Sequence, residues 1–165
     1  MKQNVIAIDG PAGAGKSTVA KMVAEKLGFV YIDTGAMYRA VTCRALAEGI
    51  ELTNHAAISE LAGRINVRFN RDETGLKVLA DGDDVTEAIR TPEVTAAVPL
   101  VSQVAAVRQA MVRLQQEMAA TGAVVLDGRD IGSVVVPDAC AKIFLTASVA
   151  ERARRRWQEM KQKGY

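Results

Sequence analysis

The chain has 165 residues, of which 49% are hydrophobic and 24% are charged, and its formal net charge is +2. This length suits one α/β domain with a small insertion, and the nearly balanced charge argues against nucleic-acid binding by bulk electrostatics, although residues 152–156 are locally basic. No apolar run approaches the ~18 residues that span a membrane and no signal peptide opens the chain, so we expect a soluble, cytoplasmic protein. Cys43 and Cys140 are too few and too far apart for a disulfide framework or a zinc site, and we expect buried thiols.

A glycine-rich loop follows a predicted strand at residues 5–9 and precedes a helical pattern. It fits the phosphate-binding pattern G-x-x-x-x-G-K-[ST]. The loop consists of Gly10, Pro11, Ala12, Gly13, Ala14, Gly15, Lys16, Ser17 and Thr18. Its glycines let backbone N–H groups reach phosphate oxygens, Lys16 adds charge at the β- and γ-phosphates, and the Ser17 hydroxyl is a ligand for Mg²⁺. An empty glycine-rich turn is disfavoured because sequence and strand–loop–helix context agree, so we expect a nucleoside triphosphate with Mg²⁺.

Strands and helices alternate in the first third of the chain. A helix is expected over residues 18–27, with Leu27 on its buried face and Gly28 as its C-terminal cap. A short strand at 29–32 then ends in Asp33 and is followed by a helix over 36–48. This alternation predicts a parallel sheet flanked by helices, in which ligands bind beyond the carboxyl ends of the strands.

The pattern changes after residue 52. Residues 54–64 favour a short helix, and 66–70 and 76–80 favour strands joined by a turn at 71–75, with a second, acidic turn at 81–84. We interpret residues 60–90 as a small antiparallel insertion, which either closes over the acceptor or is a plain structural elaboration. The acidic turn lacks the length and distal glutamate of a helix-loop-helix calcium site, so a solvated turn is expected.

The second half returns to the α/β pattern. Helices are expected over 91–99 and 102–120, and a buried strand over 123–127 ends at Asp127, a carboxylate placed to hold hydrated Mg²⁺ through water. A strand follows at 142–145. Ser148 and Glu151 match a capping box that opens a helix to about residue 163, in which the arginines of 152–156 are expected mostly to pair with neighbouring glutamates on a solvated face.

Two arginines indicate which kind of acceptor the chain binds. Arg39 and Arg129 each follow a predicted strand end on the side of the phosphate loop. The planar guanidinium matches phosphate oxygens with two parallel hydrogen bonds, so this pair suits an acceptor that is itself a phosphate ester. The alternative is two surface arginines in unrelated salt bridges; together with Asp127 and the loop, phosphate binding is favoured.

Five segments carry a more specific pattern: residues 8–17 (IDGPAGAGKS), 33–39 (DTGAMYR), 89–94 (IRTPEV), 102–108 (SQVAAVR) and 127–132 (DGRDIG). Their order and spacing resemble those of bacterial cytidylate kinases, within the nucleoside monophosphate kinases. The resemblance implies the P-loop NTPase fold over residues 1–165 and transfer of the γ-phosphoryl group of ATP to CMP, and also to dCMP, with Mg²⁺ as cofactor. ATP and CMP or dCMP are then the partners of a monomer that binds neither nucleic acid nor membranes.

The resemblance also implies roles for particular residues. Lys16, Arg39 and Arg129 would be catalytic, with the two arginines holding the acceptor phosphate. Ser102, Arg108 and Asp130 would contact the cytosine, although Ser102 also suits a helix N-cap. The residues expected to bind CMP are Thr34, Tyr38, Arg39, Ser102, Arg108, Arg129 and Asp130.

Two alternatives and one departure qualify this hypothesis. The alternatives are another small-molecule kinase of the shikimate or adenylate type, which does not need this cytosine-facing set, and a nucleotide-binding module without activity. Members of the family continue beyond the match to residues 160–165 through a lid with further arginines and a final strand and helix. Because those parts are missing here, we expect weak or no turnover, since losing such an arginine costs ~10³-fold or more by analogy with arginine fingers.

Overall fold

The computed structural model describes residues 2–73, 75–162 and 164. The chain forms two compact units, one made of Met1–Asp33 and Gln116–Tyr165 and the other of Thr34–Gln115. The phosphate loop and Asp127 belong to the first unit. The predicted antiparallel insertion belongs to the second.

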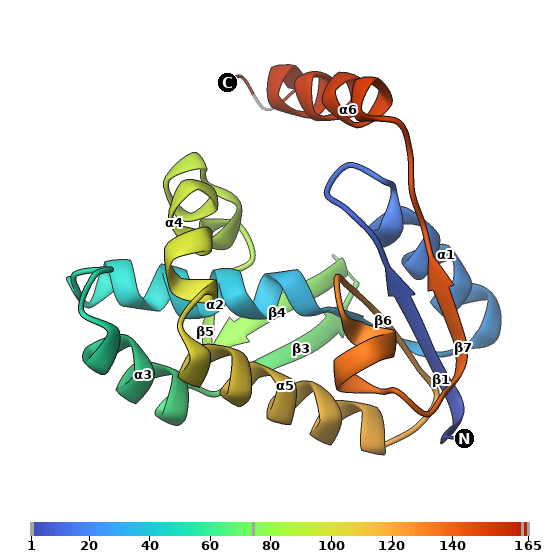
Figure 1. The fold of residues 1–165 in the computed structure, drawn as a ribbon, viewed down its shortest axis with the longest axis horizontal. Coiled ribbons are helices and arrows are strands. Elements are labelled where there is room, and N and C mark those ends of the chain that lie inside the picture. The colour runs from blue at the N-terminus through green and yellow to red at the C-terminus, as the bar shows by residue number, and fades with distance from the viewer. Residues whose placement is uncertain (1, 74, 163, 165) are drawn as a thin grey trace. The chain divides into compact units, whose positions relative to one another are not determined.

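A parallel four-stranded sheet in the order β2-β6-β1-β7 forms the centre of the first unit (Figure 1). Its strands are β1 (Lys2–Asp9), β2 (Val30–Asp33), β6 (Val124–Gly128) and β7 (Ala139–Phe144). The central strands β1 and β6 carry aliphatic residues that are buried on both faces, as in other parallel sheets, and Ile8 and Leu126 are fully buried. The predicted parallel sheet of a P-loop NTPase fold is confirmed.

Helix α1 (Lys16–Leu27) contacts β6 and β2 through small residues. Ala20 and Ala24 are its buried residues, whereas Leu27 is 51% exposed, so the expected buried position of Leu27 is wrong. The alanines bring the helix close to the sheet, and Leu27 lies at the end of the last turn. Gly28 caps the helix with φ 66°, as predicted, and its N–H faces the carbonyls of Ala24 and Glu25.

A short π-helical turn, η2 (Ile131–Val135), and helix α6 (Val149–Gln162) complete the first unit. The turn was not predicted, because five residues carry no helical periodicity. At α6 the Glu151 N–H donates to the Ser148 hydroxyl at 3.2 Å, which confirms the predicted cap. The single tryptophan of the chain, Trp157, lies on α6 with 62% of its surface exposed and the Lys161 ammonium 5.1 Å from the centre of its ring.

Helix α2 (Thr34–Ala47) is the central element of the second unit. It buries Ala36, Met37, Ala40 and Val41 and contacts the helical elements and the small sheet around it. These elements are α3 (His55–Arg64), η1 (Ala88–Arg90), α4 (Pro92–Ser102) and the strands of the small sheet. Helix α5 (Ala105–Ala120) begins in this unit and ends in the first.

The small sheet is antiparallel, as predicted, but it has three strands. They are β3 (Val67–Asp72), β4 (Gly75–Ala80) and β5 (Asp83–Asp84), in that order. The two-residue strand β5 lies within the expected acidic turn and escaped prediction because it is too short to show alternation. The expected turn at 71–75 includes residue 74, which lies outside the described residues.

Arg44 on α2 ties this acidic segment to the helix. Its Nη2 donates to the Ala80 carbonyl at 2.8 Å and to the Asp83 carboxylate at 2.9 Å, and its Nε lies 3.4 Å from Asp81. Lys77 pairs with Asp84 across the sheet. Residues 81–84 are all exposed, as expected of a solvated turn, and their aspartates are also paired with Arg44 and Lys77. The described residues contain no cluster of three or more His, Cys, Asp or Glu that could hold a metal ion.

Several helix boundaries differ from those predicted by one to three residues. Helix α2 begins at Thr34, immediately after β2, so Thr34 and Gly35 are helical rather than in a loop. The break between α4 and α5 lies at residues 103–104 instead of 100–101. Pro99 removes one backbone donor from α4, but the helix continues past it, because Val101 is fully buried and packing holds the last turn.

The cysteines are less buried than expected. Cys140 is exposed and Cys43 is partly exposed, and neither forms a disulfide. Cys140 lies on the edge strand β7, and its thiol donates to the Val5 carbonyl of the neighbouring strand β1 at 3.1 Å. No helix in the described part of the chain combines the length and the apolarity needed to cross a bilayer.

Candidate active site

The phosphate loop connects β1 to α1 and requires glycine at its first position. Gly10 has φ 148°, and a Cβ there would lie 1.9 Å from the carbonyl oxygen of Leu145. This close approach exists because the Leu145 N–H donates to the Asp9 carbonyl at 2.7 Å, which extends the β1–β7 pairing into the loop. Gly15 takes the left-handed conformation at the N-cap of α1, so the helix N-terminus follows the loop directly.

Lys16 lies over its own loop. Its ammonium donates to the Pro11 carbonyl at 3.0 Å. Burial lowers the pKa of Lys16, and the nearby Asp127 carboxylate partly opposes this change. A half-buried lysine at this position can exchange one carbonyl for phosphate oxygens at little cost in ordering, because the side chain is already held at the loop.

A buried carboxylate connects the loop to the sheet. Asp127, at the end of β6, accepts a hydrogen bond from the Ser17 hydroxyl at 2.7 Å and one from the Tyr31 hydroxyl at 3.1 Å. Burial, together with the negative charge of Asp33, raises the pKa of Asp127 to about 6. Asp33 is its direct neighbour across the β2–β6 pairing and is itself buried. Burial also raises the pKa of Tyr31, so its hydroxyl remains a hydrogen-bond donor.

The oxygen atoms around Asp127 suit a magnesium ion brought by a nucleotide. Mg²⁺ prefers hard oxygen ligands and usually takes only one or two carboxylates, with water and substrate phosphates supplying the rest. Ser17 and Asp127 offer a hydroxyl and a carboxylate 2.7 Å apart. The elevated pKa of Asp127 marks a site where negative charge is poorly compensated, which a cation would relieve.

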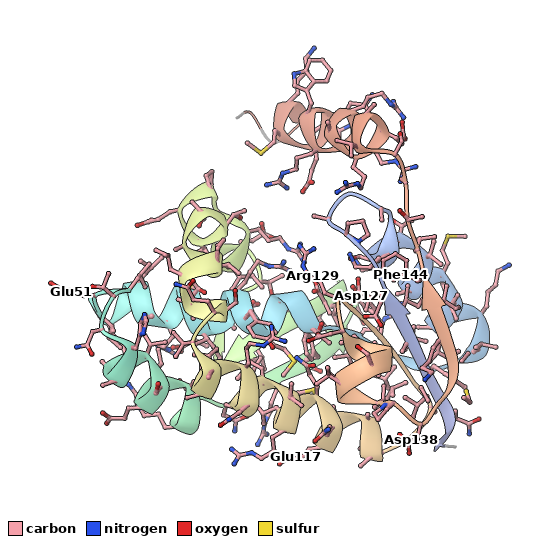
Figure 2. The ribbon with its side chains drawn as sticks, in the orientation of Figure 1. Glu51, Glu117, Asp127, Arg129, Asp138 and Phe144 are labelled. Carbon is pink, nitrogen blue, oxygen red and sulfur yellow. The ribbon has the colours of Figure 1, made fainter. Side chains whose placement is uncertain are left out.

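Arg129 and Asp130 follow β6 in the same unit. Figure 2 shows Asp127 and Arg129 together at the end of this strand. Arg129 is exposed, and Asp130 stands at the N-cap position of η2 without making a side-chain cap bond. The Asp9 carboxylate serves this turn instead, because it accepts from the N–H groups of Ile131 at 2.7 Å and Gly132 at 2.8 Å.

The other residues expected to bind CMP belong to the second unit. Thr34 and Tyr38 lie one helical turn apart in the first half of α2, with Arg39 next to Tyr38; Thr34 is buried and the other two are partly buried. Arg108 is an exposed residue in the first turn of α5.

Ser102 does not cap a helix N-terminus. It is the last residue of α4, and its hydroxyl donates to the Pro99 carbonyl at 3.4 Å. The alternative role as an N-cap is therefore wrong, and the predicted contact with the base stays a prediction.

Sequence reasoning missed a contact between α6 and the loop. As expected, Arg154 and Arg155 pair with Glu151, and Arg156 pairs with Glu159. Arg155, however, also donates to the carbonyls of Gly13 at 3.3 Å and Ala14 at 3.1 Å. Arg152, one turn earlier, donates to the Ala12 carbonyl at 3.4 Å. Their spacing of three residues places both on one helix face, which is the signal that could have separated them from the solvated arginines.

Comparison with known proteins agrees with this geometry. The family model described as "Cytidylate kinase" matches residues 6–165. Proteins named cytidylate kinase are 57% identical in Pelotomaculum thermopropionicum, 59% in Desulforamulus reducens and 52% in Bacillus subtilis. The matches cover 97%, 97% and 99% of this chain and 71%, 72% and 73% of those proteins, respectively.

A solved structure from Thermus thermophilus is 18% identical, with a TM-score of 0.46, over 100% of this chain and 75% of its own. That likeness is weak, and the assignment rests on the sequence relatives. The phosphate loop, the paired Ser17 and Asp127 and the match along nearly the whole chain agree: the chain belongs to the cytidylate kinase family.

Proposed function

We propose that this chain binds ATP with Mg²⁺ at the phosphate loop and binds CMP or dCMP as the acceptor of the γ-phosphoryl group, in the reaction that gives the diphosphate and ADP. The observation that carries the proposal is the hydrogen bond between Ser17 of the loop and the buried Asp127, in a chain that matches cytidylate kinases from residue 6 to residue 165. Family membership does not favour the alternatives, a shikimate- or adenylate-type kinase or a module without activity.

The donor half of the reaction uses the first unit. The loop amides, the N-terminus of α1 and the Lys16 ammonium bind and neutralise the β- and γ-phosphates. Ser17 and Asp127, the latter through water, hold the cation. A bound Mg²⁺ would supply positive charge that offsets the negative charge of the phosphates. No covalent enzyme intermediate is needed, because the chain's task is to hold donor and acceptor in line.

The acceptor half uses the seven residues expected to bind CMP. Arg39 and Arg129 hold the phosphate of CMP and place its attacking oxygen. Asp130 accepts from the N4 amino group of cytosine, while Arg108 and Ser102 donate to its N3 and O2 acceptors. UMP presents an O4 acceptor in place of the amino group, so it would meet the Asp130 carboxylate with repulsion.

Calorimetric titration with CMP, UMP and AMP tests this assignment. We expect CMP to bind at least about tenfold more tightly than UMP, since a site that hydrogen-bonds a polar group rejects an analogue lacking it. Asp130→Ala should remove that preference. Asp138→Ala, which changes an exposed aspartate in the same unit (Figure 2), should leave it intact. Binding of ATP without any preference among the monophosphates would contradict the acceptor assignment.

The near-neutral net charge supports nucleotides, rather than nucleic acids, as partners. We propose further that the enzyme works as a monomer. Sedimentation velocity should then give one species of 17.6 kDa with and without CMP. A concentration-dependent dimer would contradict this part of the proposal.

A further inference from the structure

We propose that Asp9 is a positioning residue for CMP: its carboxylate shapes the segment 128–132, from which Arg129 and Asp130 reach the acceptor. This inference rests on the proposed function, because it assumes that those two residues bind CMP. Asp9 itself touches no substrate in this scheme. It acts through two backbone N–H groups of the neighbouring chain segment.

Both oxygens of the Asp9 carboxylate are engaged. Oδ1 accepts from the Ile131 N–H at 2.7 Å and Oδ2 accepts from the Gly132 N–H at 2.8 Å. These distances are at the short end for N–H···O bonds, as expected where the acceptor is charged. Such a two-point attachment fixes both the distance and the orientation of residues 131 and 132 relative to the end of β1.

The attachment is reinforced from the backbone. Asp9 pairs with Gly128 of β6 on one side and with Phe144 of β7 on the other. Its carbonyl also accepts from the Leu145 N–H at 2.7 Å. Because the strand around Asp9 is held on both sides, its side chain is a rigid support for residues 131 and 132.

Asp9 also takes over the capping role that Asp130 would ordinarily have. An aspartate at an N-cap position ordinarily accepts from the N–H groups of the first helical turn. Here Asp130 holds that position in η2 but makes no side-chain cap bond, and the Gly132 N–H that a cap would use is taken by Asp9. The capping task therefore falls to Asp9, 121 positions away, and not to the Asp130 carboxylate. In the proposed function, that carboxylate accepts from the cytosine amino group.

The position of Asp9 gives it one further property. It directly precedes Gly10, the first residue of the phosphate loop, while its side chain supports the acceptor segment. Its backbone serves the donor site and its side chain serves the acceptor site. Substitutions of the Asp9 side chain should therefore lower the affinity for CMP and leave the affinity for ATP unchanged.

The test combines amide hydrogen exchange with calorimetry on Asp9→Ala, Asp9→Asn and the matched control Asp138→Ala. Asp9→Ala removes both acceptors, whereas Asp9→Asn keeps the shape and one acceptor oxygen. We expect faster exchange at the amides of residues 131 and 132 in Asp9→Ala and CMP binding weaker by about tenfold or more. Asp9→Asn should show a smaller loss, and ATP affinity should change less than about threefold in every variant. A structural role alone would weaken both nucleotides together.

Arg129→Ala and Asp130→Ala complete the series and separate the two proposals. If these variants lose CMP affinity but Asp9→Ala keeps it, or if the exchange at residues 131 and 132 does not change, the role of Asp9 is refuted and the proposed function stands. Equal losses of CMP and ATP affinity in the isosteric Asp9→Asn would also refute it. If Arg129→Ala and Asp130→Ala bind CMP normally, the acceptor assignment fails, and the role of Asp9 in CMP binding fails with it.

Discussion

The Asp127 carboxylate should leave a measurable trace in the pH dependence of stability. Its pKa is about 6 in the folded chain and 3.8 ordinarily, so between these values the folded chain binds the proton more tightly than the unfolded chain. The free energy of unfolding contributed by this group therefore falls as pH rises through that window, by up to about 3 kcal/mol.

Asp127→Asn isolates this contribution because the amide cannot titrate. In urea titrations without divalent cations, the variant should be more stable than the original chain at pH 7, and the difference should shrink towards pH 4. Other carboxylates are common to both proteins and cancel in the comparison. A stability difference that does not vary with pH would show that Asp127 has an ordinary pKa.

Lys16 provides a second prediction at the level of a single residue. Lys16→Met keeps the length of the side chain and removes its charge, and charged hydrogen bonds contribute about 1.5–3 kcal/mol each. ATP affinity measured by calorimetry should therefore fall by about 10–100-fold, while CMP affinity stays within about threefold. Lys26→Met, an exposed change at the other end of α1, is the matched control. Unchanged ATP affinity in Lys16→Met would remove this lysine from the phosphate site.

At the scale of elements, the junction of β1, β7 and the phosphate loop tolerates no side chain at residue 10. Gly10→Ala would place a Cβ 1.9 Å from the backbone oxygen of Leu145, so either the β1–β7 pairing or the loop must move. We expect a loss of at least about 2 kcal/mol in the free energy of unfolding. Gly63→Ala, in helix α3 with open space around it, should be neutral or stabilising. Similar stability of the two variants in urea titrations would contradict the close contact.

Arg44 stabilises the contact between helix α2 and the small sheet. Arg44→Met removes the bonds to Ala80 and Asp83 but keeps much of the aliphatic stem. The unfolding free energy should fall by about 1 kcal/mol, and part of the loss should disappear at 1 M salt, where ion pairs are screened. Arg64→Met removes an exposed pair with Glu48 and should cost less. Equal losses of unfolding free energy in Arg44→Met and Arg64→Met would mean that the hydrogen bond from Arg44 to the sheet does not stabilise the fold.

The elements also show where sequence patterns suffice. The phosphate loop, the parallel strands and the Gly28 cap were predicted because each has a fixed residue pattern. Three short features escaped prediction: strand β5, the turn η2 and the end of α4. Each is stabilised by contacts from elsewhere in the chain, which a local pattern does not show. Arg44 binds β5, Asp9 binds η2, and burial of Val101 stabilises the last turn of α4.

The same distinction applies to the site. Lys16, Ser17 and Asp127 could be assigned from motif and strand position, and Ser17 and Asp127 are in contact in the structure. The contribution of Tyr31 depends on a bond across 96 residues, and that of Asp9 on bonds across 122 and 123. No local pattern encodes contacts between residues so far apart in the sequence. The residues that perform the chemistry could therefore be predicted, but the residues that position them could not.

At the scale of the whole molecule, the residues expected to bind CMP are divided between the two units, whereas the phosphate loop belongs to one. Hydrogen exchange should therefore differ between nucleotides. ATP with Mg²⁺ should protect residues 10–18, and CMP should protect both residues 128–132 and the first turns of α2. Protection by CMP in a single unit would show that one half of the acceptor assignment is wrong.

The location of Trp157 determines what an optical experiment on this protein reports. It is the only tryptophan, it lies on α6 away from the sheet core, and most of its surface is exposed. Its fluorescence emission should already be close to that of indole in water, and so unfolding of the sheet should change it little. Tryptophan fluorescence is therefore a poor probe of global unfolding of this chain.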